Sequence, residues 1–594
     1  MLKTLHKSLR EYKVSSILTP LLMVGEAAME IIIPFLMTYL IKEIKNIGSE
    51  GGIHIGRVVL FACLMVAAAI FALLCGLLGA RLSAKASCGF AHNLREDMYN
   101  NLQSFSFANI DNYSTSSLIT RITTDVTNVQ NAYQMCIRML VRAPILFVAA
   151  IIMTCLIEPS MALIFVAAAV VLGVIVAICM FKVIPYFRTM FKKYDKLNEV
   201  VQEDLTAIRV VKSYVREEYE TEKMKRATQE VYDYSVKAEK VLNFLMPSVQ
   251  FVMYSTMIIL LLVGSDMAIN GWGNVDFSNL QALITYAMQI LSGVIMVAMC
   301  LNFVSMSKGS ADRICEVLTE HTTLTKPEQP VTEVADGSVD FDDVDFFYSQ
   351  KADVAVLKDI TFHIKSGETV GIIGATGSGK TSLVSLIPRL YDATQGSVKV
   401  GGVDVKNYNL DILRNSVAMV LQKNVLFSGT IAENLRWGDE NATDEDLRLA
   451  AKQACAEEFI ENLPGKYDYD LGQGGVNVSG GQKQRLCIAR AMLKKPKVII
   501  FDDSTSAVDT KTDAQIRAAL KAHAPQTTKI IIAQRVASVE DADKIIVLDD
   551  GRICGIGTHD ELIVSNEIYR EVYDSQVKGN DGTGKSIEGG ENNG

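Results

Sequence analysis

The sequence has no excess of basic residues and no closely paired cysteines. Its formal net charge is −9, whereas nucleic-acid-binding domains are usually basic, so we expect no nucleic-acid partner. The 11 cysteines include no C-x-x-C pair and lie mostly in apolar stretches, which predicts small buried residues in a reduced or membrane setting. The first apolar run is long and is not followed by a small-residue cleavage site, so we expect no cleavable signal peptide.

Long hydrophobic runs dominate the first half of the chain, and 49% of all residues are hydrophobic. A helix needs about 20 apolar residues to cross a bilayer. One of the five runs is too long for a single span, and "LIEPSMAL" (156–163) interrupts it with Glu158 and Pro159, so we predict six spans. The runs lie near 16–41, 58–80, 143–182, 243–264 and 280–305.

Charge placement predicts how these spans are oriented. The N-terminal "LKTLHKSLREYK" is basic and amphipathic, and the polar segments 81–142 and 182–242 carry many Lys and Arg, whereas the loop 265–278 carries none. Positive loops face the cytoplasm, so we expect a multi-pass plasma-membrane protein with both termini cytoplasmic. Each polar segment has about 60 residues, enough for an arm made of one helix out and one helix back.

The second half has a different composition and predicts a separate α/β domain. The segment "LTEHTTLTKPEQPVTEVAD" is polar with two prolines and is typical of a linker, and the last residues are rich in Gly and polar residues, which predicts disorder. The expected organisation is a transmembrane domain over 1–317, a linker over 318–337, an α/β domain over 338–575 and a disordered tail over 576–594.

The segment "TVGIIGATGSGKTSL" (369–383) predicts a phosphate-binding loop between a strand and a helix. Its glycines permit a tight turn whose amides bind phosphate oxygens, Lys380 reaches the terminal phosphates, and Thr381 ligates Mg²⁺. The expected nucleotide-binding residues of this loop are Gly374, Ala375, Thr376, Gly377, Ser378, Gly379, Lys380, Thr381 and Ser382.

Two further motifs complete the nucleotide chemistry. The strand "KVIIFDD" ends in Asp502, which has the position of the carboxylate that holds Mg²⁺. In "VSGGQKQR" (478–485), Ser479, Gly480, Gly481 and Gln482 precede a helix and predict a second phosphate-binding helix N-terminus. One nucleotide cannot use both sites of one chain if they lie on different faces, but two such domains facing head to tail would solve this.

This order of motifs resembles that of an ATP-binding cassette domain, and the whole chain resembles a six-helix ABC exporter half-transporter of the type IV, multidrug or lipid type. The resemblance implies that Tyr348 stacks on adenine, that Gln422 contacts Mg²⁺ and faces the membrane domain, and that Asp509 belongs to the D-loop. It also implies that short coupling helices of the two arms press on the cassettes. Two cassettes would sandwich two ATP molecules, and closure would turn the transmembrane cavity outward until hydrolysis reopens it.

The chain departs from the family pattern around the γ-phosphate. The family usually has glutamate after the Mg²⁺-binding aspartate, histidine in the switch loop and often glutamate before the signature, whereas this chain has Asp503, Gln534 and Gln473. The Asp503 carboxylate sits about 1.5 Å short, and a misplacement of about 1 Å can cost on the order of 10²-fold in rate. Glutamine can hydrogen-bond a phosphate but carries no proton or charge.

We interpret the catalytic-position residues Asp503 and Gln534 as one functional change, because both serve the same ATP. They predict a site that binds ATP but cleaves it poorly, while the intact VSGGQ completes the active site of a different subunit. This is the pattern of one half of a heterodimeric bacterial exporter. A homodimeric exporter with an active Asp503, an ATP-gated membrane protein that does not drive transport, and an importer with an exporter-like fold stay as alternatives.

Two acidic residues in the first span bear on the substrate. Glu26 and Glu30 lie four residues apart in the first span and therefore share a helix face. Intramembrane charges are often functional, so these carboxylates predict a polar patch for cationic or amphipathic substrates, such as drugs or lipid-like compounds. The alternative is a structural role in which they pair with another helix, for example through Arg142. The Met-rich sixth span predicts either an adaptable pocket or ordinary helix packing.

Overall fold

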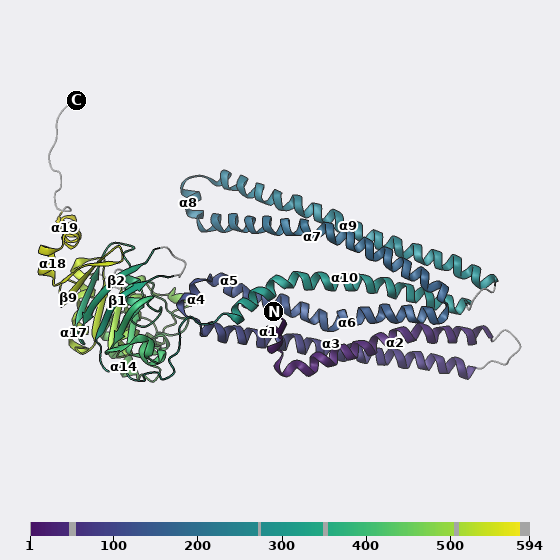
Figure 1. Cartoon of the computed structure of the whole chain (residues 1–594), viewed down its shortest axis with the longest axis horizontal. Coiled ribbons are helices and arrows are strands. Elements are labelled where there is room, and N and C mark those ends of the chain that lie inside the picture. The colour runs from purple at the N-terminus through teal and green to yellow at the C-terminus, as the bar shows by residue number, and fades with distance from the viewer. Residues whose placement is uncertain (1, 47–54, 271–274, 349–353, 504–509, 582–594) are drawn as a thin grey trace, which may run out of the picture. The chain divides into compact units, whose positions relative to one another are not determined.

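The computed structural model describes residues 2–46, 55–270, 275–348, 354–503 and 510–581 (Figure 1). The chain divides into two compact units. The helical unit comprises Met1–Gln103 and Ser114–Glu320, and the cassette unit comprises Ser104–Tyr113 and His321–Gly594.

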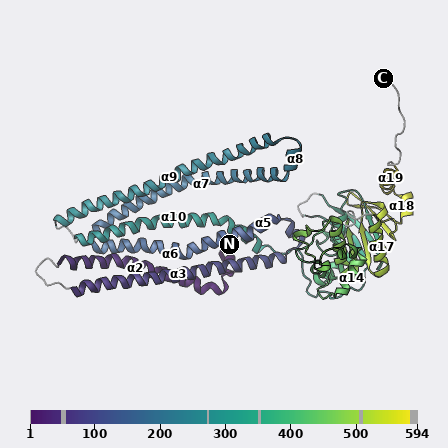
Figure 2. The ribbon, with the colours of Figure 1, turned by 180° about the vertical axis from the view of Figure 1, so that it is seen from behind.

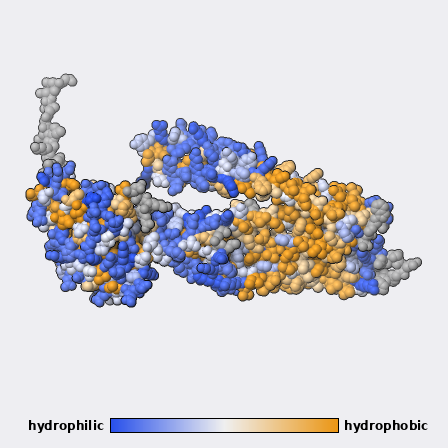
Figure 3. Space-filling model, viewed as in Figure 1, coloured by the Kyte–Doolittle hydropathy of each residue, from blue (hydrophilic) through white to orange (hydrophobic). Residues whose placement is uncertain are grey.

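Among the described residues of the helical unit, six helices are long and apolar enough to cross a membrane, which confirms the predicted spans. Figure 3 shows a broad hydrophobic band across these helices, with hydrophilic residues covering the ends at which α5 and α8 lie. The elements of this unit are α1 (Leu2–Lys7), η1 (Arg10–Tyr12), α2 (Lys13–Asn46), α3 (Ile55–Gln103), α5 (Thr115–Thr120), the π-helical η2 (Arg121–Asp125), α6 (Val126–Ile157), α7 (Pro159–Thr206), α8 (Ile208–Ser213), α9 (Glu217–Asn270) and α10 (Phe277–Thr319).

The predicted break in the third hydrophobic run is confirmed at Glu158. This residue is extended, with φ −157° and ψ 109°, and it separates α6 from α7. Pro159 takes the first position of α7, where a helix needs no backbone N–H. A single extended residue followed by proline is therefore enough to turn one long apolar run into two spans.

The long helices pack in pairs: α2 with α3, α6 with α10, and α7 with α9. Figures 1 and 2 show α7 and α9 side by side along their length, with the short α8 joining them at one end. Since α7 has 48 residues and α9 has 54, each continues well beyond a bilayer thickness. The prediction of an arm made of one helix out and one helix back is met by α7, α8 and α9.

The other arm is tied to α10 by buried charges in the π-helical segment η2. Asp125 has 1% of its surface exposed, and it accepts hydrogen bonds from Arg313 at 2.7 Å (Nε–Oδ2) and 2.5 Å (Nη2–Oδ1). Arg121 donates to Glu316 at 2.8 Å and to the carbonyl of Arg313 at 2.9 Å. These bonds connect η2 to the last turns of α10, the helix that leads into the cassette unit.

The cassette unit is built on a six-stranded sheet in the order β10-β9-β3-β8-β7-β6, in which β10 alone is antiparallel to its neighbour. Strands β7 and β8 are buried at every residue, as expected for parallel strands covered on both faces. Ile372 of β3 and Asp502 of β7 both pair with Ile532 of β8, so these three strands end at one edge. The strands are β3 (Thr369–Ile373), β6 (Val417–Val420), β7 (Val498–Asp502), β8 (Thr528–Ile532), β9 (Lys544–Asp549) and β10 (Arg552–Gly557).

A second, antiparallel sheet and a set of helices complete this unit. The sheet has the order β2-β1-β4-β5, with β1 (Val339–Phe346), β2 (Leu357–Ile364), β4 (Gln395–Val400) and β5 (Val403–Asp404). The helices are α4 (Phe107–Asp111), α11 (Lys380–Ser385), α12 (Leu410–Ser416), α13 (Ile431–Arg436), α14 (Asp444–Gln453), α15 (Glu457–Glu461), α16 (Gly480–Leu493), α17 (Thr510–His523), α18 (His559–Ser565) and α19 (Glu567–Asp581). Short 3-10 turns lie between them: η3 (Val405–Asn407), η4 (Lys466–Asp468), η5 (Gln473–Gly475) and η6 (Val536–Ser538).

The short helix α4 of the first arm belongs to the cassette unit. Asn109 donates to the carbonyl of His321 at 3.0 Å, and the hydroxyls of Ser106 and Thr323 lie 2.7 Å apart. Tyr391 donates to Asp111 at 2.7 Å. The sequence boundaries gave this segment to the transmembrane domain, whereas its side chains bond within the cassette.

The linker is anchored by a fully buried arginine. Arg389 is 0% exposed, and its Nη2 donates to the carbonyl of Thr325 at 2.9 Å while its Nε donates to Asp392 at 2.7 Å. A buried guanidinium needs such partners because an unpaired buried charge is costly. Thr325, which lies in the predicted linker, is therefore part of the packed cassette.

Two predicted boundaries differ from the helices observed. α10 continues to Thr319, two residues into the predicted linker. α19 continues to Asp581, so the expectation of disorder is wrong for 576–581, and residues 582–594 lie outside the described residues. Ile568, Val572 and Tyr573 pack α19 onto the core, and a helix nucleated in this way extends at low cost into polar sequence.

Candidate nucleotide-binding site

The phosphate-binding loop follows β3 and leads into α11. Gly377 and Gly379 have φ values of +88° and +95°, which favour glycine. At Gly374 a Cβ atom would lie 2.0 Å from the carbonyl oxygen of Leu548, so only glycine fits there. Lys380 Nζ donates to the carbonyls of Gly374 and Ala375 at 2.8 and 2.7 Å, and burial lowers the pKa of this ammonium. The backbone of the loop is thus tightly curved, and the Lys380 ammonium is held against its carbonyl groups.

Thr381 and Asp502, the two predicted Mg²⁺ ligands, meet at the edge of the sheet. Thr381 Oγ1 donates to Asp502 Oδ1 at 2.9 Å, and Asp502 is 2% exposed. Burial raises the pKa of Asp502, and the bond from Thr381 opposes that rise. Hydroxyl and carboxylate oxygens are the donors that Mg²⁺ prefers, so these residues fit a Mg²⁺-bound nucleotide: Thr381 and Asp502 would hold the ion, with Gln422 beside them.

Asp503 lies directly beyond the end of β7 and is the meeting point of two loops. Its backbone has φ +48°, and its side chain is 8% exposed. Asp503 Oδ2 accepts from Gln534 Nε2 at 2.5 Å and from Gln422 Nε2 at 3.2 Å. The two residues that depart from the family pattern are thus in direct contact, and Asp503 also accepts a bond from Gln422, the glutamine predicted to face the membrane domain.

The predicted adenine-stacking residue, Tyr348, stands next to the phosphate-binding helix. Its hydroxyl is 2.8 Å from the Ser382 hydroxyl, and its ring is 48% exposed. The ring of Tyr391 packs edge-on against it, with centroids 5.2 Å apart. Sequence reasoning missed Tyr391, which also bonds to α4, because no spacing rule links residues 348, 391 and 111.

The signature residues Ser479, Gly480 and Gly481 lie at the start of α16. Ser479 Oγ accepts from Gln482 N at 3.3 Å and Gln482 Oε1 accepts from Ser479 N at 2.8 Å, which is a capping box. A Cβ atom built on Gly480 would have nothing within 4 Å. Gln473 lies in the preceding turn η5 (Gln473–Gly475), and Asp509 lies outside the described residues. This helix end is therefore preformed and open.

Comparison with known proteins assigns the chain to a family. Residues 16–294 match the model of the ABC transporter transmembrane region, and residues 357–506 match that of the ABC transporter. The protein YfiB of Bacillus subtilis (strain 168), an ABC transporter ATP-binding protein, is 33% identical over 575 residues, 96% of this chain and 97% of its own length. This chain belongs to the ABC transporter family.

Other relatives agree with this assignment. An ABC transporter ATP-binding protein of Mycobacterium tuberculosis (strain ATCC 25618 / H37Rv) is 35% identical over 508 residues, 85% of this chain and 86% of its own length. A solved structure, a bacterial Atm1-family ABC exporter with ATP bound, shares the fold with a TM-score of 0.80 at 24% identity and covers 98% of this chain and 99% of its own. This ABC transporter therefore couples ATP hydrolysis to transport and has the six-helix exporter fold followed by an α/β nucleotide-binding domain.

The predicted substrate carboxylates of the transporter share one arginine. Arg142 Nη2 lies 2.8 Å from Glu30 Oε2 and 3.6 Å from Glu26 Oε1. Gln289 of α10 donates to the backbone carbonyl of Glu30 at 3.2 Å. The structural pairing that the sequence left open is thus present, and it joins α2, α6 and α10.

Proposed function

We propose that this chain is the ATP-holding half of a heterodimeric ABC exporter. The observation that carries the proposal is the contact between Asp503 and Gln534, at 2.5 Å. In the family pattern a glutamate activates water and a histidine contacts the γ-phosphate. Here a shorter carboxylate accepts hydrogen bonds from two amides, Gln534 and Gln422. Neither amide can take up a proton or become charged. Such a site keeps its ATP bound and turns it over slowly.

The intact signature supports a role in a second active site. The capping box at Ser479 preorganises the first turn of α16, and Gly480 leaves its amide open to an approaching phosphate. In a head-to-tail pair of cassettes, this signature would serve a nucleotide held by the second subunit. The partner would carry the catalytic glutamate and histidine.

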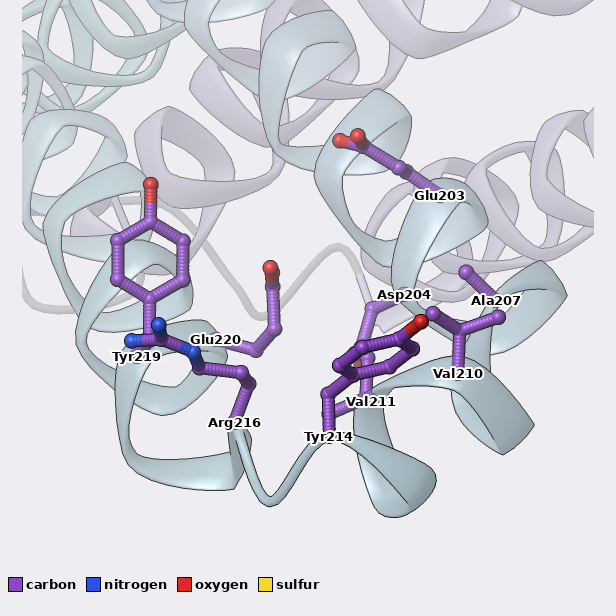
Figure 4. A pocket seen from close by; sticks show the side chains of 9 residues that line it. All are labelled: Glu203, Asp204, Ala207, Val210, Val211, Tyr214, Arg216, Tyr219 and Glu220. Carbon is purple, nitrogen blue, oxygen red and sulfur yellow. The ribbon is translucent and has the colours of Figure 1, made fainter.

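The tip of the arm formed by α7, α8 and α9 supports docking of a second subunit. Tyr214 and Val215 are 74% and 79% exposed between α8 and α9, at the tip of this arm. Figure 4 shows the side chains around a pocket of about 580 Å³ at this tip, lined by Glu203, Asp204, Ala207, Val210, Val211, Tyr214, Arg216, Tyr219 and Glu220. Exposed aromatic and aliphatic side chains framed by charges are typical of protein interfaces.

The test is ATP turnover by the full chain purified alone, with nucleotide binding measured in the same sample. We expect saturable binding of Mg²⁺·ATP without appreciable phosphate release. Robust turnover by the chain alone would contradict the holding-site proposal and favour a homodimer with an active Asp503. Conformational cycling on ATP binding without substrate-dependent hydrolysis would favour an ATP-gated protein instead.

We further propose that the exporter carries amphipathic cations across a bacterial plasma membrane, with both termini in the cytoplasm. Glu26 and Glu30 together face one arginine, Arg142, so the cluster has one carboxylate more than it has cations. An unpaired negative charge inside a membrane span is energetically costly unless a cationic ligand neutralises it. Met288 and Met299 are exposed on α10, the helix whose Gln289 bonds to Glu30, and they would offer an adaptable apolar surface.

Glu26→Gln tests this substrate class by removing the surplus carboxylate while keeping the side-chain size. We expect stimulation of ATPase activity by tetraphenylphosphonium to need about 10-fold more cation, while stimulation by a neutral amphiphile of similar size stays unchanged. Glu43→Gln is the matched control, because Glu43 lies on the same helix and pairs with Arg57 instead. Equal weakening for the cation and the neutral compound, or no change for either, would show that the cluster is structural.

A further inference from the structure

Gln576 of the C-terminal helix α19 makes two hydrogen bonds to the switch loop, the segment after β8 that contains Gln534. Gln576 Nε2 donates to the backbone carbonyl of Gln534 at 2.8 Å, and Gln576 Oε1 accepts from the backbone N–H of Val536 at 2.9 Å. Both ends of the amide are therefore used on two residues of one loop. This bidentate contact fixes the loop backbone on both sides of Arg535, directly after β8.

The helix that presents Gln576 is itself firmly anchored. Tyr569 is 0% exposed, its hydroxyl lies 2.8 Å from His559 Nδ1, and its backbone N–H donates to Asn566 Oδ1 at 2.9 Å. Asn566 in turn donates to the carbonyl of Cys554 in β10 at 3.1 Å. α19 is therefore a rigid support for the switch loop and not a loosely attached tail.

The opposite side of the same loop is held by α17. Ser538 donates to Asp513 at 3.2 Å, and Arg517 Nη2 donates to the carbonyl of Ala537 at 3.3 Å. These contacts bind residues 537 and 538, whereas Gln576 alone among these side chains reaches residue 534 itself. The position of the Gln534 side chain thus depends on Gln576 more than on α17.

We propose that Gln576 is a positioning residue that sets the Gln534 amide for recognition of the γ-phosphate of ATP. The contacts run from Gln576 to the Gln534 backbone, and from the Gln534 side chain to Asp503 at 2.5 Å. Gln576 does not itself touch the nucleotide in this scheme. The site then distinguishes ATP from ADP partly through the C-terminal helix. The proposal rests on ATP binding by this chain and is independent of whether the second subunit is identical.

Gln576→Ala in the full chain tests this by comparing affinities for Mg²⁺·AMPPNP and Mg²⁺·ADP. We expect AMPPNP to bind about 5- to 10-fold more weakly, the effect of about one lost hydrogen bond, and ADP to bind as before, since it has no γ-phosphate. Gln576→Glu keeps the acceptor for Val536 and loses the donor to Gln534, so we expect it to resemble Gln576→Ala. Ser575→Ala is the matched control, because the Ser575 hydroxyl bonds to its own helix at Val572.

Two outcomes would overturn the proposal. Equal weakening of AMPPNP and ADP would show that Gln576 only supports the fold. Unchanged AMPPNP affinity would show that Gln534 finds its position without α19. A double variant adds a second readout. In a Gln534→Ala background, Gln576→Ala should cause no further loss of AMPPNP affinity. A full additional loss would show that Gln576 does not act through Gln534, which contradicts the proposal.

Discussion

Replacing Asp503 with glutamate should raise ATP turnover at this chain's own site on the order of 10²-fold. The added methylene moves the carboxylate about 1.5 Å toward the γ-phosphate, and a displacement of about 1 Å is worth on the order of 10²-fold in rate. The longer side chain would also leave the position in which Gln534 and Gln422 now hold Asp503 Oδ2. The measurement is phosphate release by the full chain at saturating Mg²⁺·ATP.

Two variants make this result interpretable. Asp503→Asn keeps the length of the side chain and removes the charge, so we expect no gain. Gln534→His alone should raise ATP turnover only slightly. In combination with Asp503→Glu it should raise turnover further, because both side chains are proposed to act at the same phosphate. If Asp503→Glu leaves turnover unchanged while Asp503→Ala abolishes it in the assembled transporter, the native aspartate is a competent catalytic group and the holding-site proposal fails.

Gly480→Asp should reduce ATP hydrolysis by the assembled transporter at least on the order of 10²-fold without weakening ATP binding to this chain's own phosphate loop. A Cβ at this position meets nothing within 4 Å, so the fold accepts the side chain, and an acidic residue suits the first turn of a helix. A carboxylate about 4 Å from a phosphate of the second nucleotide would cost about 4 kcal/mol at an effective dielectric of 20.

The measurement combines ATPase activity of the dimer with photolabelling of this chain by azido-ATP. Asn441→Asp is the control, because it adds the same charge at an exposed position just before α14. We expect the control to keep full activity. Loss of labelling of this chain together with activity would show that the signature serves the site of its own chain, which contradicts the head-to-tail arrangement.

The features that sequence predicted well are those with short-range rules. The strand–loop–helix at 369–385 and the contact between Thr381 and Asp502 follow from motif spacing and from strands that end at one edge, and six spans follow from hydropathy and from the break at Glu158. Contacts between single side chains that lie far apart in the sequence leave no comparable pattern in the sequence. Neither Tyr391 with Asp111 nor Gln576 with Gln534 is marked by any local pattern. The polar composition of the C-terminal region even predicted disorder where α19 continues.

The inclusion of α4 and Thr325 in the cassette unit bears on how this protein can be dissected. A separately expressed cassette that begins at β1 would lack the carbonyl that pairs with the buried Arg389 and the carboxylate that receives the Tyr391 hydroxyl. Tyr391 packs on Tyr348, so the aromatic side chain predicted to stack on adenine would lose a packing partner. Nucleotide affinities measured on such a fragment would describe a site that lacks part of its packing. The affinities of the native site should therefore be measured on the full-length chain.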